Sequence, residues 1–304
     1  MMTSKSFGVV ALVVCLLAFT SAGMAKPARF IRIDYPGAVD TLAFGINPGG
    51  DIVGGYTDTL GHKHGFTLRN GNFISFDWPG STWTEGWGIN PQGDIVGQYG
   101  WFENGFNTIH GFLLRDGTLY PIDVPGQPNT QAVKISPEGT IVGCYHVGTA
   151  GGGTLLNTMY GFVLDAAGVV TSHSMNRTMN NGINPAGDVV GFYYSPTTGL
   201  VEQSYLISDG ALTWFQFPGS VATLAWDISA TGTIVGFHRS SLAGPLPQFH
   251  GFVTEHGEMT SFDVPEASAT RAYGVSATGD IVGYYTDSTG HNHGFLLSRR
   301  GPQE

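Results

Sequence analysis

Residues 88–97 have the sequence GINPQGDIVG, and this stretch decides the fold because its pattern occurs six times along the chain. The other copies begin at Gly45, Lys134, Gly182, Asp227 and Gly274. An Asn or Ser, often followed by Pro and then by Gly at the fourth position, is typical of a tight turn between two strands. We expect that Gly to take the left-handed conformation of a hairpin loop with a G1 bulge. Each copy therefore predicts a β-hairpin.

Working outward from the hairpins, each copy belongs to a longer repeat of 43 to 48 residues that begins near a threonine. The six threonines are Thr41, Thr84, Thr130, Thr178, Thr223 and Thr270. Every repeat contains a Thr strand, an Ile-Val-Gly strand, a His-Gly-Phe strand and a strand ending in Phe-Asp-x-Pro-Gly, with local variations. Four short strands at this period are typical of a β-propeller blade. A solenoid of the same period would need capping repeats at its ends.

The two ends of the repeated region are complementary. The region begins with a fourth-type strand at residues 30–35, and its last repeat ends after the third-type strand Phe295 to Leu297. Pairing these strands would complete the last repeat and remove an exposed sheet edge. We therefore predict one all-β domain over residues 26–300. It is a six-bladed β-propeller with four strands per blade, closed by the N-terminal strand and followed by a short tail at 301–304.

The first 25 residues have the layout of a secretory signal peptide, with Lys5 before an apolar run and small residues up to Ala25. The apolar run is short for a transmembrane helix. Of the two cysteines, Cys15 lies in this segment, so only Cys144 would remain after cleavage and no intramolecular disulfide would be possible. We expect a secreted or periplasmic bacterial protein with no membrane insertion after cleavage.

The overall charge and composition limit the partners. The formal net charge of −10 argues against nucleic acid and anionic membranes. Only 12% of the residues are charged and 46 are glycine, which favours closely packed strands and tight turns. The sequence contains no Gly-rich phosphate loop and no HExxH motif. We expect no cofactor and a monomer.

The repeat unit also resembles a known family. The pattern Thr-x-Ala-x-Gly-Ile-Asn-x-x-Gly-Asp-Ile-Val-Gly-x-Tyr, followed by His-Gly-Phe-Leu-Leu and Phe-Asp-x-Pro-Gly, is similar to the HAF-type bacterial extracellular repeat. That repeat is named for a His-Ala-Phe motif, which is His-Gly-Phe in this chain. The resemblance covers essentially the whole chain after residue 25. It implies an exported repeat protein and no particular activity.

The connections between strands differ in character. Those after the first and third strands of each repeat are short and nearly constant, so they should lie together at one end of the ring, the fixed-turn end. The others vary in length and content and should lie at the opposite, variable-loop end. Variable loops on a rigid scaffold are where function usually resides.

At the variable-loop end, the residues that break the repeat symmetry are the best candidates for ligand binding. We select Trp83, Glu85, Trp101 and Arg271, because aromatic and Arg side chains commonly anchor ligands. Two functions remain open. One is a binding module for a glycan or an envelope protein. The alternative is a secreted hydrolase or lyase acting on polysaccharide through unrepeated carboxylates at the channel mouth; Glu85, Asp227, Glu103 and Glu202 are the acids that break the symmetry.

Several repeated side chains have both a chemical and a structural interpretation. His62, His64, His291 and His293 are candidate metal ligands, which ring closure would place on adjacent blades. The repeated His positions favour a packing or loop-capping role instead, and we predict no metal site. Asp34, Asp77, Asp123 and Asp263 suggest paired acids, although a repeated Asp before a turn is typical of a bend-fixing residue. The aromatic row Phe44, Trp87, Trp226 and Tyr273 could stack sugars, but its repeat position predicts core packing.

Overall fold

The structure is a computed structural model that describes residues 29–103, 106–127, 129–147, 158–195, 202–241, 248–255 and 257–299, without the side chains of residues 102, 103, 106 and 107. The expected signal peptide, the tail at 301–304 and the side chain of Glu103 lie outside this description. Within it, no helix is long and apolar enough to span a membrane.

The described residues form β-strands throughout. The strands are β1 (Arg29–Ile33), β2 (Asp40–Ile46), β3 (Ile52–Thr57), β4 (Lys63–Arg69), β5 (Asn72–Phe76), β6 (Trp83–Ile89), β7 (Ile95–Glu103), β8 (Phe106–Arg115), β9 (Thr118–Ile122), β10 (Asn129–Ile135), β11 (Ile141–His146), β12 (Met159–Leu164), β13 (Val170–Ser172), β14 (Thr178–Ile183), β15 (Val189–Tyr194), β16 (Glu202–Ser208), β17 (Ala211–Phe215), β18 (Ala222–Ile228), β19 (Ile234–Arg239), β20 (His250–Glu255), β21 (Glu258–Phe262), β22 (Ala269–Val275), β23 (Ile281–Thr286) and β24 (Asn292–Ser298).

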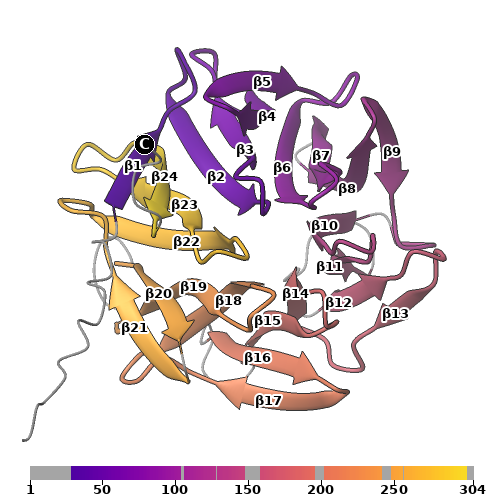
Figure 1. Cartoon of the computed structure of the whole chain (residues 1–304). Helices are drawn as coiled ribbons and strands as arrows, with labels where there is room; N and C mark the ends of the chain where they lie inside the picture. The colour runs from indigo at the N-terminus through magenta and orange to yellow at the C-terminus, as the bar shows by residue number, and fades with distance from the viewer. Residues whose placement is uncertain are drawn as a thin grey trace, which may run out of the picture.

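The strands form antiparallel sheets arranged around a common centre as the blades of a β-propeller (Figure 1). Four sheets have four strands each, and one has eight strands. In the eight-stranded sheet, a single parallel pair between Lys63 of β4 and Trp83 of β6 joins β2–β5 to β6–β9. β1 pairs with β24 from Arg29 opposite Ser298 to Ile33 opposite Gly294, so the two ends of the described chain share one sheet.

The repeated turns have the predicted geometry. Gly50, Gly93, Gly139, Gly187, Gly232 and Gly279 all have positive φ, between 81° and 89°. In the first turn, the N–H of Gly50 donates to the carbonyl of Asn47, and the Asn47 side chain accepts the N–H of Asp51. The Asn or Ser therefore fixes the turn through its own side chain.

The repeated Gly of each Ile-Val-Gly strand is required by a carbonyl oxygen of the neighbouring strand and by an aromatic ring. A Cβ added to Gly97 would lie 2.1 Å from the Glu85 carbonyl oxygen and 2.7 Å from the ring of Phe112, which stands opposite it on β8. Phe112 is fully buried. The Ile-Val-Gly and His-Gly-Phe motifs therefore form one packing unit inside each sheet.

The repeated Thr caps the connection that enters each blade. The hydroxyl oxygen of Thr84, for example, accepts the N–H of Trp78 at 3.0 Å, and the residue six positions earlier makes the same bond to five of the six threonines. At Thr178 the hydroxyl oxygen instead accepts the N–H of Gly161 on β12. In those five repeats the bond fixes the connection between two successive blades, because the donor lies in the segment that precedes the Thr strand. Every repeated Thr therefore accepts a backbone N–H from the preceding repeat.

The aromatic row packs in the core, as its repeat position predicts. Phe44 stacks on Trp87 with ring centroids 4.2 Å apart, Trp87 lies 5.4 Å from Trp226, and Trp226 lies 4.5 Å from Tyr273. These rings come from four different repeats and belong to one buried cluster with Val133. The centre of the propeller is therefore filled with side chains at this level.

Candidate functional site

A second layer of side chains covers the central cluster toward the variable-loop end. Each member follows the repeated Thr directly in the sequence, and the six are Leu42, Glu85, Gln131, Met179, Leu224 and Arg271. Leu42, Met179 and Leu224 pack into the central cluster. The other three are polar, and they come from three different repeats. This layer is where the repeat symmetry is broken most strongly.

Glu85 is held in place by a neighbouring cation and an amide. Its side chain is only 8% exposed. One carboxylate oxygen accepts from the ammonium of Lys63 at 3.1 Å, and the other accepts from the Gln98 amide at 3.4 Å. Gly55 leaves the room for this side chain, because an added Cβ there would lie 3.1 Å from Cγ of Glu85.

Arg271 lies against aromatic rings. Its guanidinium carbon is 4.5 Å from the ring centroid of Phe249 and 5.3 Å from that of Tyr284. The residue is half-buried, and within the described ranges its guanidinium makes no hydrogen bond or ion pair. Cation–π contacts orient the group, while its N–H donors remain available to a ligand.

A second arginine occupies the same region, and it is neutralised. Arg239 lies 5.3 Å from the ring centroid of Phe249 and 3.3 Å from a carboxylate oxygen of Glu202. Burial raises the pKa of Glu202, although the positive charge of Arg239 opposes this effect. Burial also raises the pKa of the adjacent Tyr194 to about 12.

The two tryptophans selected from the sequence occupy different places. Trp83 is half-buried at the start of β6, two residues from Glu85, and its ring covers Gly100 on β7. Trp101 lies on β7, where its indole N–H donates to the carbonyl of Gly80 at 2.7 Å. It also packs against Tyr99 and has a structural role that the sequence did not predict. Trp83 and Glu85 share one strand, Arg271 shares the layer with Glu85, and Trp101 belongs to the packing of its own blade.

The histidines form pairs with carboxylates. Nδ1 of His64 lies 2.9 Å from Asp77, and the same motif pairs His110 with Asp123, His250 with Asp263 and His293 with Asp34. These bonds join the third and fourth strands of one blade. The repeated Asp therefore binds the repeated His, rather than only backbone N–H groups as its sequence position suggested.

The four candidate metal ligands are engaged in the same way. Nε2 of His64 and Nδ1 of His62 lie 3.5 Å and 3.3 Å from Asp58. Nε2 of His293 lies 3.2 Å from Asp287, and Nδ1 of His291 lies 4.0 Å from Asp40. Across the described ranges, no three His, Cys, Asp or Glu side chains are placed to share a metal ion.

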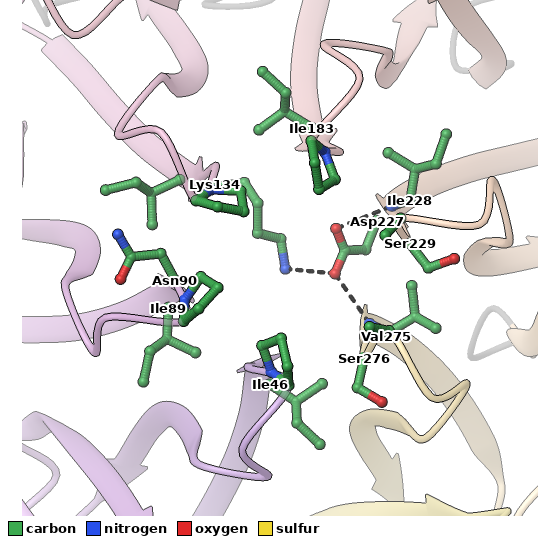
Figure 2. Close-up of a pocket in the computed structure, with 17 residues that line it drawn as sticks. Ile46, Ile89, Asn90, Lys134, Ile183, Asp227, Ile228, Ser229, Val275 and Ser276 are labelled. Atoms are coloured by element: carbon green, nitrogen blue, oxygen red, sulfur yellow. Dashed lines mark hydrogen bonds and ion pairs between the residues drawn. The ribbon is translucent and has the colours of Figure 1, made fainter.

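At the fixed-turn end, the axis of the propeller opens into a cavity of about 80 Å³ that all six repeats line (Figure 2). Buried branched side chains form its wall, and the second residue of each turn lies at its rim. The wall residues are Ile46, Ile89, Ile135, Ile183, Ile228 and Val275, and the rim residues are Pro48, Pro91, Pro137, Pro185, Ala230 and Ala277.

A buried ion pair crosses this cavity, with Lys134 and Asp227 pointing toward each other from two repeats (Figure 2). The Lys134 ammonium lies 3.0 Å from Asp227, and the two side chains are 8% and 7% exposed. The carboxylate also accepts the N–H groups of Ile228 and Val275 at 3.0 Å. Burial raises the pKa of Asp227, and Lys134 counteracts part of this effect.

Sequence reasoning missed this pair, although a signal for it existed. Lys134 and Asp227 occupy the first position of the ten-residue pattern, where the other four copies have Gly. An added Cβ at Gly45 would lie 2.7 Å from the carbonyl oxygen of Trp87 in the next repeat, which explains Gly there. The opposite charges of Lys134 and Asp227, at a position that is otherwise Gly, could have indicated an ion pair across the axis.

Comparison with known proteins shows similarity in structure alone. No family model and no curated protein sequence matches the chain. A solved structure of AofleA from Arthrobotrys oligospora is 13% identical, covers 89% of this chain and 87% of its own, and has a TM-score of 0.52. Aleuria aurantia lectin in complex with Fucα1-6GlcNAc is 12% identical, with coverage of 85% and 91% and a TM-score of 0.50.

A third solved structure is the β-propeller domain of the Trilobed protease from Pyrococcus furiosus. It is 10% identical, covers 88% of this chain and 96% of its own, and has a TM-score of 0.48. At these identities, the similarity to AofleA and to the Aleuria lectin extends to the overall fold, which this chain shares with them.

Proposed function

We propose that this protein is an exported binding module of the HAF-type repeat class, which holds a glycan or a cell-envelope component at the variable-loop end of its propeller. The observation that carries the proposal is the position of Arg271. Its guanidinium lies over Phe249 and Tyr284 and has no anionic partner among the described residues. An oriented arginine whose donors are unused is typical of a ligand anchor.

The state of the symmetry-breaking acids supports binding in preference to hydrolysis. Glu85 binds Lys63, Glu202 binds Arg239, and Asp227 binds Lys134 at the opposite end of the axis. Hydrolysis of a glycoside by two carboxylates requires one to act as an acid and the other as a base or nucleophile across the bond to be cleaved. Three acids that each neutralise their own cation are better suited to holding a structure or a ligand in place.

The architecture that presents this site is a closed ring of six blades. In this interpretation, the eight-stranded sheet counts as two blades, because only the Lys63–Trp83 pair joins its two halves. The pairing of β1 with β24 then supplies the fourth strand of the last blade. Secretion or export to the periplasm follows from the expected signal peptide at residues 1–25, and the closed ring suits a monomer.

The test combines a glycan and cell-envelope binding screen with a hydrolysis assay on the same purified protein. Hits are then titrated against Arg271→Ala and Trp83→Ala, with Gln92→Ala and Glu138→Ala as exposed controls at the fixed-turn end. We expect the first two variants to weaken binding with little change in melting temperature, and the controls to bind normally. Cleavage of a bound polysaccharide, or loss of affinity confined to Gln92 and Glu138, would contradict the proposal.

A further inference from the structure

We propose that the ligand presents the carboxylate of an acidic sugar, a uronate residue, to the guanidinium of Arg271. This inference rests on the proposed function and names the chemical class that the same site selects. It depends on the local charge, on the geometry of the arginine and on the polar side chains that share its layer.

The charges around the site do not cancel. Lys63 is balanced by Glu85, and Arg239 is balanced by Glu202. Arg271 adds one further positive charge with no carboxylate beside it among the described residues. The chain as a whole has a net charge of −10, so the excess of positive charge at this site is opposite in sign to the charge of the whole protein. A site with one surplus positive charge matches a ligand group with a single negative charge, such as a carboxylate.

The surroundings of Arg271 favour a planar anion. The aromatic rings of Phe249 and Tyr284 restrict the guanidinium, and its half-buried position strengthens electrostatic interactions relative to bulk water. A guanidinium has five N–H donors in a fixed fork, which matches the two oxygens of a carboxylate. Lysine lacks this fork, so the two cations are not equivalent at such a site.

The rest of the layer suits the hydroxyl groups of a sugar. Glu85 accepts one hydrogen bond on each carboxylate oxygen and retains further acceptor capacity. Gln131 occupies the next repeat at the same position and is half-buried. Acceptors for hydroxyl groups and a donor fork for a carboxylate therefore lie in one layer of the ring.

The experiment compares acidic oligosaccharides with versions of the same sugars that have no charge. Trigalacturonate and trimannuronate, and the methyl ester of each, are titrated into the purified protein by calorimetry. A charge-assisted bidentate interaction should make the acids bind about tenfold or more tightly than the esters. Arg271→Met should remove that preference, and Arg271→Lys should retain only part of it.

The matched control is Arg115→Met, which removes one positive charge at the fixed-turn end, where Arg115 binds Asp94. It should leave the ratio of acid to ester affinities unchanged. If acid and ester bind equally well and Arg271→Met abolishes the binding of both, the uronate assignment is wrong. The proposed binding site would still stand in that case. Failure of both acids to bind would also overturn the assignment. If an acid binds and Arg271→Met leaves its affinity unchanged, both the uronate assignment and the location of the site are contradicted.

Discussion

His238 occupies a position where the other five repeats have tyrosine, and it reproduces the contacts of that tyrosine. The five residues are Tyr56, Tyr99, Tyr145, Tyr193 and Tyr285. His238 stacks on Phe217 at 3.7 Å, as Tyr56 stacks on Tyr35 at 3.6 Å. Its Nε2 lies 2.9 Å from the hydroxyl of Ser261. Burial lowers the pKa of His238 from 6.5 to about 4.

This histidine should make the fold sensitive to acid. Below pH 6.5 the unfolded chain protonates His238 while the native protein does not, so stability falls as the pH decreases from 6.5 to about 4 and the effect is complete below that. The full loss from this group is about 3 kcal/mol. We expect His238→Tyr to flatten the stability profile in this window, measured by urea unfolding from pH 7 to pH 4. A variant with the same slope as the wild type would contradict the assignment.

Gly97 gives a steric prediction at the same scale. Gly97→Ala places a methyl group against the Glu85 carbonyl oxygen and the ring of Phe112, so it should destabilise the fold by at least about 1–3 kcal/mol. Gly49→Ala is the control, because Gly49 is exposed and its φ is not positive. That change should stay within about 0.5 kcal/mol. Similar melting temperatures for the two variants would show that a methyl group fits at position 97, and would contradict the steric argument.

At the scale of strands and turns, local chemistry made much of the molecule predictable. The Asn or Ser and the Gly of each turn set the hairpins. The sequence did not indicate which repeats meet across the axis, because Lys134 and Asp227 are brought together by the ring and not by any local element. The His–Asp pairs were missed for a related reason. Each repeated residue had a sufficient local explanation when taken alone.

The Lys134–Asp227 pair should be strongly coupled. Removing either charge leaves the other buried, which typically costs about 3–5 kcal/mol. We therefore expect the double variant Lys134→Met with Asp227→Asn to lose less unfolding free energy than the two single variants lose together. The difference should exceed about 1 kcal/mol. Urea unfolding at pH 7 gives the four free energies of unfolding.

The control for this cycle is the exposed pair Arg69–Asp51, with an N···O distance of 3.3 Å and side chains 42% and 27% exposed. Exposed pairs contribute about 1 kcal/mol or less. If the coupling energy of Lys134 and Asp227 is no larger than that of the control pair, the ion pair does not stabilise the contact between the two repeats.

At the scale of the whole molecule, we expect stability to depend on the contact between β1 and β24, the first and last strands that the structure describes. Phe30 of β1 packs against Phe262 and Phe295, with centroid distances of 6.3 Å and 5.7 Å. Deleting residues 29–37 should expose the edge of β24 and lower the melting temperature far more than deleting residues 301–304. Similar melting temperatures for the two deletions would contradict a closed ring.

The two ends of the propeller axis differ in chemistry. The fixed-turn end has an apolar wall and a neutralised ion pair, whereas the variable-loop end has Arg271, which has no anionic partner among the residues that the structure describes. Sequence reasoning selected Arg271 because it breaks the repeat, but the sequence could not show that Phe249 and Tyr284 orient it. That arrangement depends on side chains from two neighbouring blades.

Hydrogen–deuterium exchange with and without a ligand from the screen tests the proposed location of the site most directly, because it reports which end of the propeller the ligand protects. We expect slower exchange in peptides that contain Glu85, Phe249 and Arg271, and no change in the turns at 47–50, 90–93 and 136–139. Protection confined to those turns would place the ligand at the fixed-turn end and contradict the account.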